Sequence, residues 1–161
     1  MIIAGIGSRE TPVEHLIALE ECGKALASYG HRGRSGGASG ADTAFECGFR
    51  AVRPDLLRSY GAQDGQSNEL MRLAEQFHPA WDRCSNYAKL LHARNGAILL
   101  DNDMKTPVDA IVCWTPGGQI KGGTGQALRI AASPEYNIPV FNLALVPIDA
   151  LYQWMWGRYN A

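Results

Sequence analysis

The hydrophobic positions of the chain alternate between short apolar runs and stretches with helical spacing. The first apolar run is MIIAGIG, and from Val13 to Leu26 apolar residues recur every three to four positions. This pattern predicts a strand followed by an amphipathic helix. We expect the helix to open at Thr11-Pro12, with Glu14 completing a capping box, and to close at Gly30.

The same alternation continues to the end of the chain. The expected strands after the first are 31–34, DLLRSYG, VDAIVCW and IPVFNL. Helices are expected over SGGASGADTAFECGFRAV, over 66–100 with a break at Pro79, from the loop after VDAIVCW to about Ala132, and at LYQWMWGRY. VDAIVCW is the clearest strand, since a continuous apolar run is typical of a parallel sheet covered on both faces. Strands alternating with helices predict an α/β fold with a mostly parallel sheet, in a single domain over residues 1–161.

Composition and charge exclude several classes of partner. The 161 residues are 46% hydrophobic, enough for a core, and the net charge is -1 with both signs interspersed. Without a basic patch, we expect no nucleic-acid partner. No apolar run approaches the roughly 20 residues of a membrane span, and MIIAGIGSRE lacks the features of a secretory signal. We therefore expect no membrane association and a cytoplasmic location.

The cysteines and histidines show no spacing typical of a metal site. They are Cys22, Cys47, Cys84, Cys113, His15, His31, His78 and His92. There is no CxxC pair and no histidine motif. The sequence therefore predicts reduced, mostly buried cysteines, no metal and no cofactor.

Three glycine-rich loops follow predicted strands. They are GIGSRE, SGGASGAD and TPGGQIKGGTG. The carboxyl ends of parallel strands meet at one edge of a sheet, where helix N-termini and successive backbone N–H groups favour an anion such as phosphate. Each loop alone could be a tight strand-to-helix turn. Three such loops at one edge favour a phosphate-binding cleft.

Two well-known nucleotide motifs do not fit these loops. GIGSRE has Glu10 where a dinucleotide fingerprint needs its third glycine, and the next strand ends at Arg34-Ser35 rather than at an acidic residue. Lys121 lies in GGQIKGGTG, which has no GK[ST] triplet. A nicotinamide-dependent dehydrogenase and a P-loop ATPase are therefore not indicated.

The ordered motifs resemble those of the SLOG superfamily. This group includes the Lonely Guy cytokinin-activating enzymes, the SLOG domain of DNA-processing protein A and small YspA-like proteins. SGGASGAD resembles the SG-x-A-x-G-[IA]-D segment of the last two, and PGG…GGTG resembles the Lonely Guy PGG-x-GT loop with residues inserted at 120–122. The resemblance implies a Rossmann-like three-layer sandwich that binds a nucleotide-derived ligand, commonly as a homo-oligomer.

The resemblance also bears on catalysis. Lonely Guy enzymes hydrolyse an N-glycosidic bond with an arginine from an MHxRK-like helix and a glutamate from PGG-x-GT-x-x-E. LLHARN supplies Arg94, but Ala127 occupies the glutamate position, with Gln126 beside it. Neither side chain can act as a general base. We expect hydrolysis to be lost unless Asp42 or Glu46 takes the role.

The predicted ligand-binding residues lie in the three loops and on the LLHARN helix. They are Gly7, Ser8, Arg9, Ser35, Gly36, Gly37, Gly40, Asp42, Arg94, Asn95, Pro116, Gly117, Gly118, Lys121, Gly122, Gly123 and Thr124. Alternatives remain for the charged ones: Arg9 could pair with Glu10, Asp42 could only stabilise a helix start, Arg94 could lie on a solvated face, and Lys121 could be a solvent-exposed lysine.

Aromatic residues offer two further possibilities. Trp81 and Trp114 could stack on a base or pack against the core, and the C-terminal YQWMWGRY could dock on the sheet or form a homodimer interface.

The function predicted first is binding of a nucleotide or nucleotide-derived signalling molecule, of ADP-ribose or cyclic-nucleotide type, by a sensor or sequestering protein without turnover. The alternatives are a nucleoside-monophosphate phosphoribohydrolase of Lonely Guy type and a single-stranded DNA-binding module.

Overall fold

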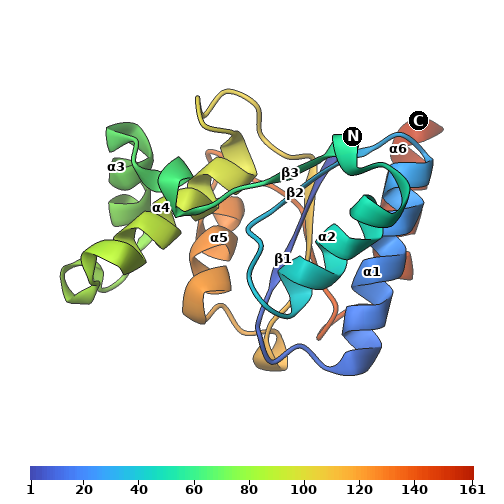
Figure 1. Ribbon diagram of the computed structural model, residues 1–161, viewed down its shortest axis with the longest axis horizontal. Helices are drawn as coiled ribbons and strands as arrows, with labels where there is room; N and C mark the ends of the chain where they lie inside the picture. The colour runs from blue at the N-terminus through green and yellow to red at the C-terminus, as the bar shows by residue number, and fades with distance from the viewer.

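The computed structural model describes all residues, 1–161, and contains one parallel sheet (Figure 1). Its strands are β1 (Ile2–Gly7), β2 (Arg32–Ser35), β3 (Leu57–Ser59), β4 (Ala110–Trp114) and β5 (Val140–Asn142), in the order β3-β2-β1-β4-β5. Every neighbouring pair is parallel, which confirms the predicted α/β class. The chain builds outward from β1 to β3 and then crosses to the other side at β4. The strand order therefore reverses between β1 and β4, where ligands bind in open α/β sheets.

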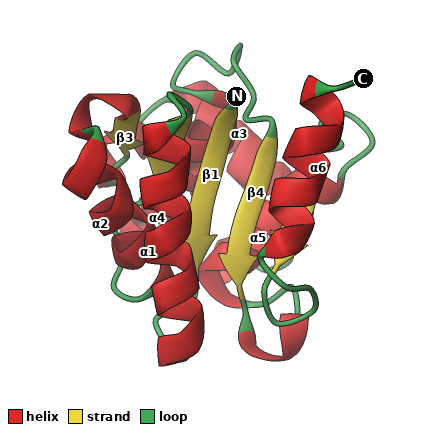
Figure 2. Cartoon of the chain, turned by 90° about the vertical axis from the view of Figure 1, so that its right-hand side faces the viewer, coloured by secondary structure: helices red, strands yellow, loops and turns green.

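Helices cover both faces of this sheet. They are α1 (Val13–Ser28), α2 (Ala41–Val52), α3 (Asn68–Phe77), α4 (Asn86–Leu100), α5 (Gly122–Ala132) and α6 (Asp149–Tyr159). One apolar core lies between the sheet and α1, α2 and α6, and a second lies between the sheet and α3, α4 and α5. Figures 1 and 2 show these layers, with β1 and β4 running side by side in the same direction.

The central strands are buried on both faces because their side chains alternate between the two cores. Ile3 of β1 packs among the residues of α1 and α2, whereas Ala4 packs on the α4 side. Gly5 leaves space for the ring of Phe45, since a Cβ at Gly5 would overlap that ring. Glycine in β1 therefore lets α2 approach the sheet closely.

The start of α1 differs from the capping box predicted from the sequence. Pro12 is the N-cap and no side chain caps the helix. The hydroxyl of Thr11 instead donates to the carbonyl oxygen of Ser8 at 2.6 Å, within the loop after β1. Gly30 ends the helix as predicted, with φ +78° and its N–H bonded to the carbonyl of Ala27.

The break predicted at Pro79 is confirmed, because α3 ends at Phe77 and α4 begins at Asn86. Ser67 and Ser85 cap these helices by accepting backbone N–H groups three residues on. No helix of the chain is long and apolar enough to cross a membrane.

The register between β1 and β4 brings two of the glycine loops together. Gly7 lies opposite Trp114, the last residue of β4. The N–H of Ser8 continues this pairing by donating to the carbonyl of Trp114 at 3.0 Å. The loops after β1 and β4 therefore begin at the same level of the sheet.

Candidate functional site

A cleft of about 510 Å³ lies at the carboxyl ends of β1 and β4, where the strand order reverses. Its walls come from the loop after β1, the start of α2, one face of α4 and the loop that enters α5. Ligand pockets for small molecules typically span about 300–1,000 Å³. The cleft therefore has the size and position of a small-molecule site.

The cleft brings together most, but not all, of the predicted ligand-binding residues. Those that line it are Gly7, Ser8, Arg9, Asp42, Arg94, Asn95, Pro116, Lys121, Gly122, Gly123 and Thr124. Those that do not are Ser35, Gly36, Gly37, Gly40, Gly117 and Gly118. The second group lies outside the lining of the cleft, and contact with a ligand stays a prediction for both groups.

The residues outside the cleft have structural roles. The hydroxyl of Ser35 is buried and donates to the carbonyl of Gly5 at 2.6 Å. Gly40, with φ +91°, presses against the loop after β1, and a Cβ there would lie 2.6 Å from the carbonyl oxygen of Ser8. Glycine at position 40 therefore serves the packing of two loops on each other rather than close approach to a ligand.

Sequence reasoning missed part of the lining. These residues are Ile6, Glu10, Ala38, Ala88, Leu91, His92 and Thr115. Helical spacing could have found those on α4, since Leu91 precedes Arg94 by three residues and Asn95 by four and so shares their face. Ala38 and Glu10 lie within the motifs already singled out.

Asp42 is the most unusual side chain of the cleft. It lies in the first turn of α2, only 4% exposed. Its Oδ1 accepts the N–H of Gly7 and its Oδ2 the N–H of Gly36, both at 3.0 Å. Burial raises the pKa of Asp42 to about 6, against the opposing effects of Arg94 and these N–H groups.

These hydrogen bonds change what two of the glycine loops can do. The N–H groups of Gly7 and Gly36 already donate to an internal carboxylate. They are therefore not free to bind a phosphate, although the loop motifs predict that role. Asp42 lies both in the first turn of α2 and in the lining of the cleft, and its contact with a ligand stays a prediction.

Arg94 projects from α4 toward the loop after β2. Its Nη1 donates to the carbonyl oxygens of Gly36, at 2.6 Å, and Tyr60, at 3.1 Å. Its Nε is buried without a hydrogen-bond partner, and burial lowers the pKa of the guanidinium despite the nearby charge of Asp42. The alternative of a solvated helix face is therefore wrong for Arg94.

Asn95 and the loop after β4 form the opposite wall. The side-chain Nδ2 of Asn95 donates to the carbonyl of Gly123 at 2.9 Å, which ties α4 to the start of α5. Helix α5 has no side-chain cap at Lys121. Because the first N–H groups of a helix lack intrahelical acceptors, those of Gly122, Gly123 and Thr124 are available to a ligand beside the exposed Lys121.

The other charged candidates near the cleft are settled by their contacts. Arg9 is exposed and makes no ion pair with Glu10. The carboxylate of Glu46 accepts the hydroxyl of Ser59 at 2.6 Å and lies 3.1 Å from the guanidinium of Arg50, outside the cleft. Glu46 therefore forms a structural ion pair with Arg50, and its carboxylate does not line the cleft where a catalytic glutamate would be needed.

The position that corresponds to the Lonely Guy glutamate faces away from the cleft. Ala127 is buried in the core shared with α3 and α4. Gln126 is fully buried, with its Nε2 donating to the carbonyl of Ala74 at 2.9 Å and its Oε1 accepting from Arg129 at 2.8 Å. Both residues pack α5 against its neighbours.

Trp81 and Trp114 contact neighbouring side chains and do not line the cleft. Trp114 stacks on His15 with ring centroids 6.2 Å apart, and Lys89 lies over Trp81 at 5.3 Å. On α6, Leu151 and Met155 are buried, while Trp156 is 72% exposed. The homo-oligomer interface expected at this helix stays a prediction.

The turn between α3 and α4 brings together histidine and cysteine side chains whose spacing in the sequence does not indicate a metal site. There the ligand atoms of His78, Cys84 and His92 lie within 4.8 Å of one another. His78 and Cys84 follow α3, whereas His92 comes from the second turn of α4, so the sequence spacing alone does not reveal the cluster.

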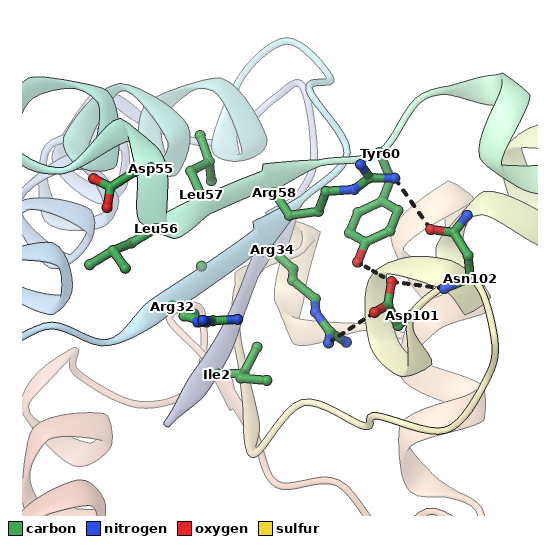
Figure 3. Close-up of a pocket in the computed structure, with 11 residues that line it drawn as sticks. Ile2, Arg32, Arg34, Asp55, Leu56, Leu57, Arg58, Tyr60, Asp101 and Asn102 are labelled. Atoms are coloured by element: carbon green, nitrogen blue, oxygen red, sulfur yellow. Dashed lines mark hydrogen bonds and ion pairs between the residues drawn. The ribbon is translucent and has the colours of Figure 1, made fainter.

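A second pocket, of about 420 Å³, lies along β2 and β3 (Figure 3). Two of its three arginines, Arg34 and Arg58, are engaged with the protein itself, whereas Arg32 is exposed. Arg34 donates to the carbonyl of Thr106 at 2.7 Å and lies 3.9 Å from Asp101, and Arg58 bonds to Asp64 and Asn102. The hydroxyl of Tyr60 completes this network by donating to Asp101 at 2.9 Å. The network fixes the end of α4 against the sheet.

Comparison with known proteins supports the fold. The sequence matches no protein-family model and no curated protein. Among solved structures, the chain is similar to DNA processing protein A from Helicobacter pylori, described for its single-stranded DNA binding mode, with 16% identity and a TM-score of 0.56. The match covers 88% of this chain but 64% of the other, so the chain spans less than two thirds of that protein. This similarity confirms the predicted Rossmann-like fold.

Proposed function

We propose that the chain binds a nucleotide or nucleotide-derived molecule in the cleft and holds it without hydrolysis. The proposal is carried by the difference in charge between the two ends of the cleft. One end has the free N–H groups of α5 together with Lys121, and the other has the buried carboxylate of Asp42 beside the guanidinium of Arg94. A molecule with an anionic group and hydrogen-bond donors at opposite ends matches this arrangement.

The phosphate is assigned to the α5 end. The helix dipole adds partial positive charge there, and the exposed cation Lys121 is the N-cap residue of the same helix. A few charge-assisted hydrogen bonds of about 1.5–3 kcal/mol each support micromolar affinity after the costs of association are met.

The sugar is assigned to the Asp42 end. A carboxylate repels phosphate but accepts hydrogen bonds from hydroxyl groups, and its two oxygens offer about four acceptor sites. Two are used by the N–H groups of Gly7 and Gly36, so acceptor capacity remains for the ligand. A ribose hydroxyl is the natural donor of a nucleotide for this position.

Holding rather than hydrolysis is supported by the contacts of the candidate catalytic groups. Position 127 lies in the core, and Glu46 is bound to Ser59 and Arg50.

Isothermal titration calorimetry with ribonucleoside monophosphates, cyclic nucleotides and ADP-ribose tests this proposal. We expect micromolar binding of at least one, about fivefold weaker binding in Lys121→Ala, and no change in Lys105→Ala, an exposed lysine outside the cleft. The 2′-deoxy analogue should bind about tenfold more weakly. Absence of saturable binding by every compound would refute the proposal, and release of free base on chromatography would refute holding without turnover.

Single-stranded DNA binding is a second candidate, favoured by the structural similarity to DNA processing protein A. A cleft that takes one nucleotide can also take one unit of a single strand, and the exposed Tyr87 on α4 offers a ring for stacking. The near-neutral net charge predicts weak binding that involves few phosphate contacts. Fluorescence anisotropy with a labelled oligothymidylate distinguishes the two: saturable DNA binding lost in Lys121→Ala favours this candidate, and none at low salt removes it.

A further inference from the structure

The turn between α3 and α4 gathers three side chains with metal-binding chemistry outside the charged ends of the cleft. His78 is the C-cap of α3, Cys84 follows the short 3-10 helix Trp81–Arg83, and His92 lies on α4. The Sγ of Cys84 is 3.7 Å from Nε2 and 3.9 Å from Nδ1 of His78, and the two imidazole rings have centroids 4.4 Å apart. All three side chains are partly buried.

These separations approach those required by a shared zinc ion. With Zn–S about 2.3 Å and Zn–N about 2.0–2.1 Å, a tetrahedral site places sulfur and nitrogen about 3.6 Å apart and two nitrogens about 3.4 Å apart. The contact between Cys84 and His78 already has this length. Since all ligand atoms lie within 4.8 Å, a movement of about 1 Å by the His92 ring or its neighbours completes the set.

The ligand atoms of the three side chains have few hydrogen-bond partners that would compete with an ion. Nδ1 of His92 is buried and has no hydrogen-bond partner, a state that costs about 1–3 kcal/mol for a polar atom. Apart from the two histidine nitrogens, the thiol of Cys84 has only the carbonyl of Ala80 near it, at 3.6 Å. Nδ1 of His78 accepts the N–H of Ala80 at 3.0 Å, and metal binding through either nitrogen of His78 exchanges this bond for a metal bond.

We propose that His78, Cys84 and His92 bind one divalent zinc-like ion. A thiolate with two imidazoles favours zinc over magnesium or calcium, which prefer oxygen ligands. Binding forms one sulfur–metal and two nitrogen–metal bonds, and the thiol proton passes to solvent. Three protein ligands leave the fourth tetrahedral position to water or to a donor atom from outside the protein. Because His92 also lines the cleft, the ion lies beside it.

Cobalt(II) titration of the full-length, chelator-treated protein tests the site, independently of any nucleotide. We expect a thiolate-to-cobalt charge-transfer band in the near ultraviolet and intense visible bands of tetrahedral cobalt, both abolished by one equivalent of zinc. Cys84→Ser should lose the charge-transfer band, whereas Cys47→Ser, an exposed cysteine on α2, should keep it.

A second variant guards against misfolding of the first. His92→Gln should weaken cobalt binding at least tenfold while retaining the circular dichroism spectrum of the parent protein. Absence of a charge-transfer band in the wild type at excess cobalt would overturn the proposal. So would a band of equal intensity in Cys84→Ser, because the thiolate would then come from another cysteine.

Discussion

The ionisation of Asp42 makes a prediction whose sign the structure determines. Burial raises its pKa from 3.8 to about 6 in the folded protein. Between these two pH values the folded state binds a proton that the unfolded state has released, so the free energy of unfolding falls as pH rises through this range. At neutral pH the buried charge therefore costs about 3 kcal/mol, from a shift of about two pKa units at 1.36 kcal/mol each.

The measurement is urea unfolding of the wild type and Asp42→Asn between about pH 7.5 and pH 4.5. The other carboxylates titrate alike in both proteins, so the difference between the two unfolding free energies isolates Asp42. We expect the wild type to gain about 2 kcal/mol relative to the variant over this interval. The exposed Asp82→Asn serves as the matched control and should show no such gain.

The opposite outcome has a definite physical meaning. Backbone N–H groups stabilise a carboxylate, and Asp42 accepts two of them. If these bonds outweighed burial, the wild type would lose stability relative to the variant as pH falls. That result, or a difference that does not change with pH, would refute the reasoning.

Three further substitutions test the packing around the cleft. Gly40→Ala should lose at least about 2 kcal/mol of unfolding free energy in urea, because a Cβ at position 40 meets the loop after β1. Gly123→Ala, which has open space around it, should lose less than about 1 kcal/mol. Equal losses would contradict this explanation. Ala127→Glu should destabilise by about 3 kcal/mol or more without producing free base, since an unpaired charge would enter the core; a stable, hydrolytic variant would show that position 127 reaches the cleft. Gln126→Ala should lower the free energy of unfolding, measured by thermal unfolding, by about 2–3 kcal/mol, because the variant loses two buried hydrogen bonds. The control Gln119→Ala, at an exposed position, should change it little. A negligible loss in Gln126→Ala would mean that the two hydrogen bonds of Gln126 make no net contribution to stability.

The sequence predicts the layers of this fold well because its strands and helices differ strongly in pattern. The continuous apolar run of β4 and the periodic stretch of α1 leave little choice of element. Parallel strands then bring the glycine loops to one edge. The place of the cleft follows from topology, which the sequence implies.

The use of each loop could not be predicted in the same way. A glycine motif indicates that backbone N–H groups converge, but not which acceptor they meet. Here the acceptor for Gly7 and Gly36 is Asp42, at a sequence separation of 35 residues from Gly7. Gln126 illustrates the same limit, because its partner at Ala74 lies on another helix.

The cluster at the α3–α4 turn was missed for a geometric reason. His78 and His92 are separated by a proline-containing turn, a 3-10 helix and the first turns of α4. Metal motifs are recognised when their ligands share one element or one tight turn. The angle between two helices brings this set together, and sequence spacing does not encode that angle.

The carboxylate that occupies the amides of two loops has a thermodynamic consequence. Asp42 joins the end of β1 to the loop after β2 through Gly7 and Gly36, so these backbone segments are ordered before any molecule enters. A ligand that enters the cleft then contacts a rigid, preorganised wall, so binding costs little backbone entropy of the protein. Its heat-capacity change should accordingly reflect the surface it buries, without the added contribution of loops that fold around it.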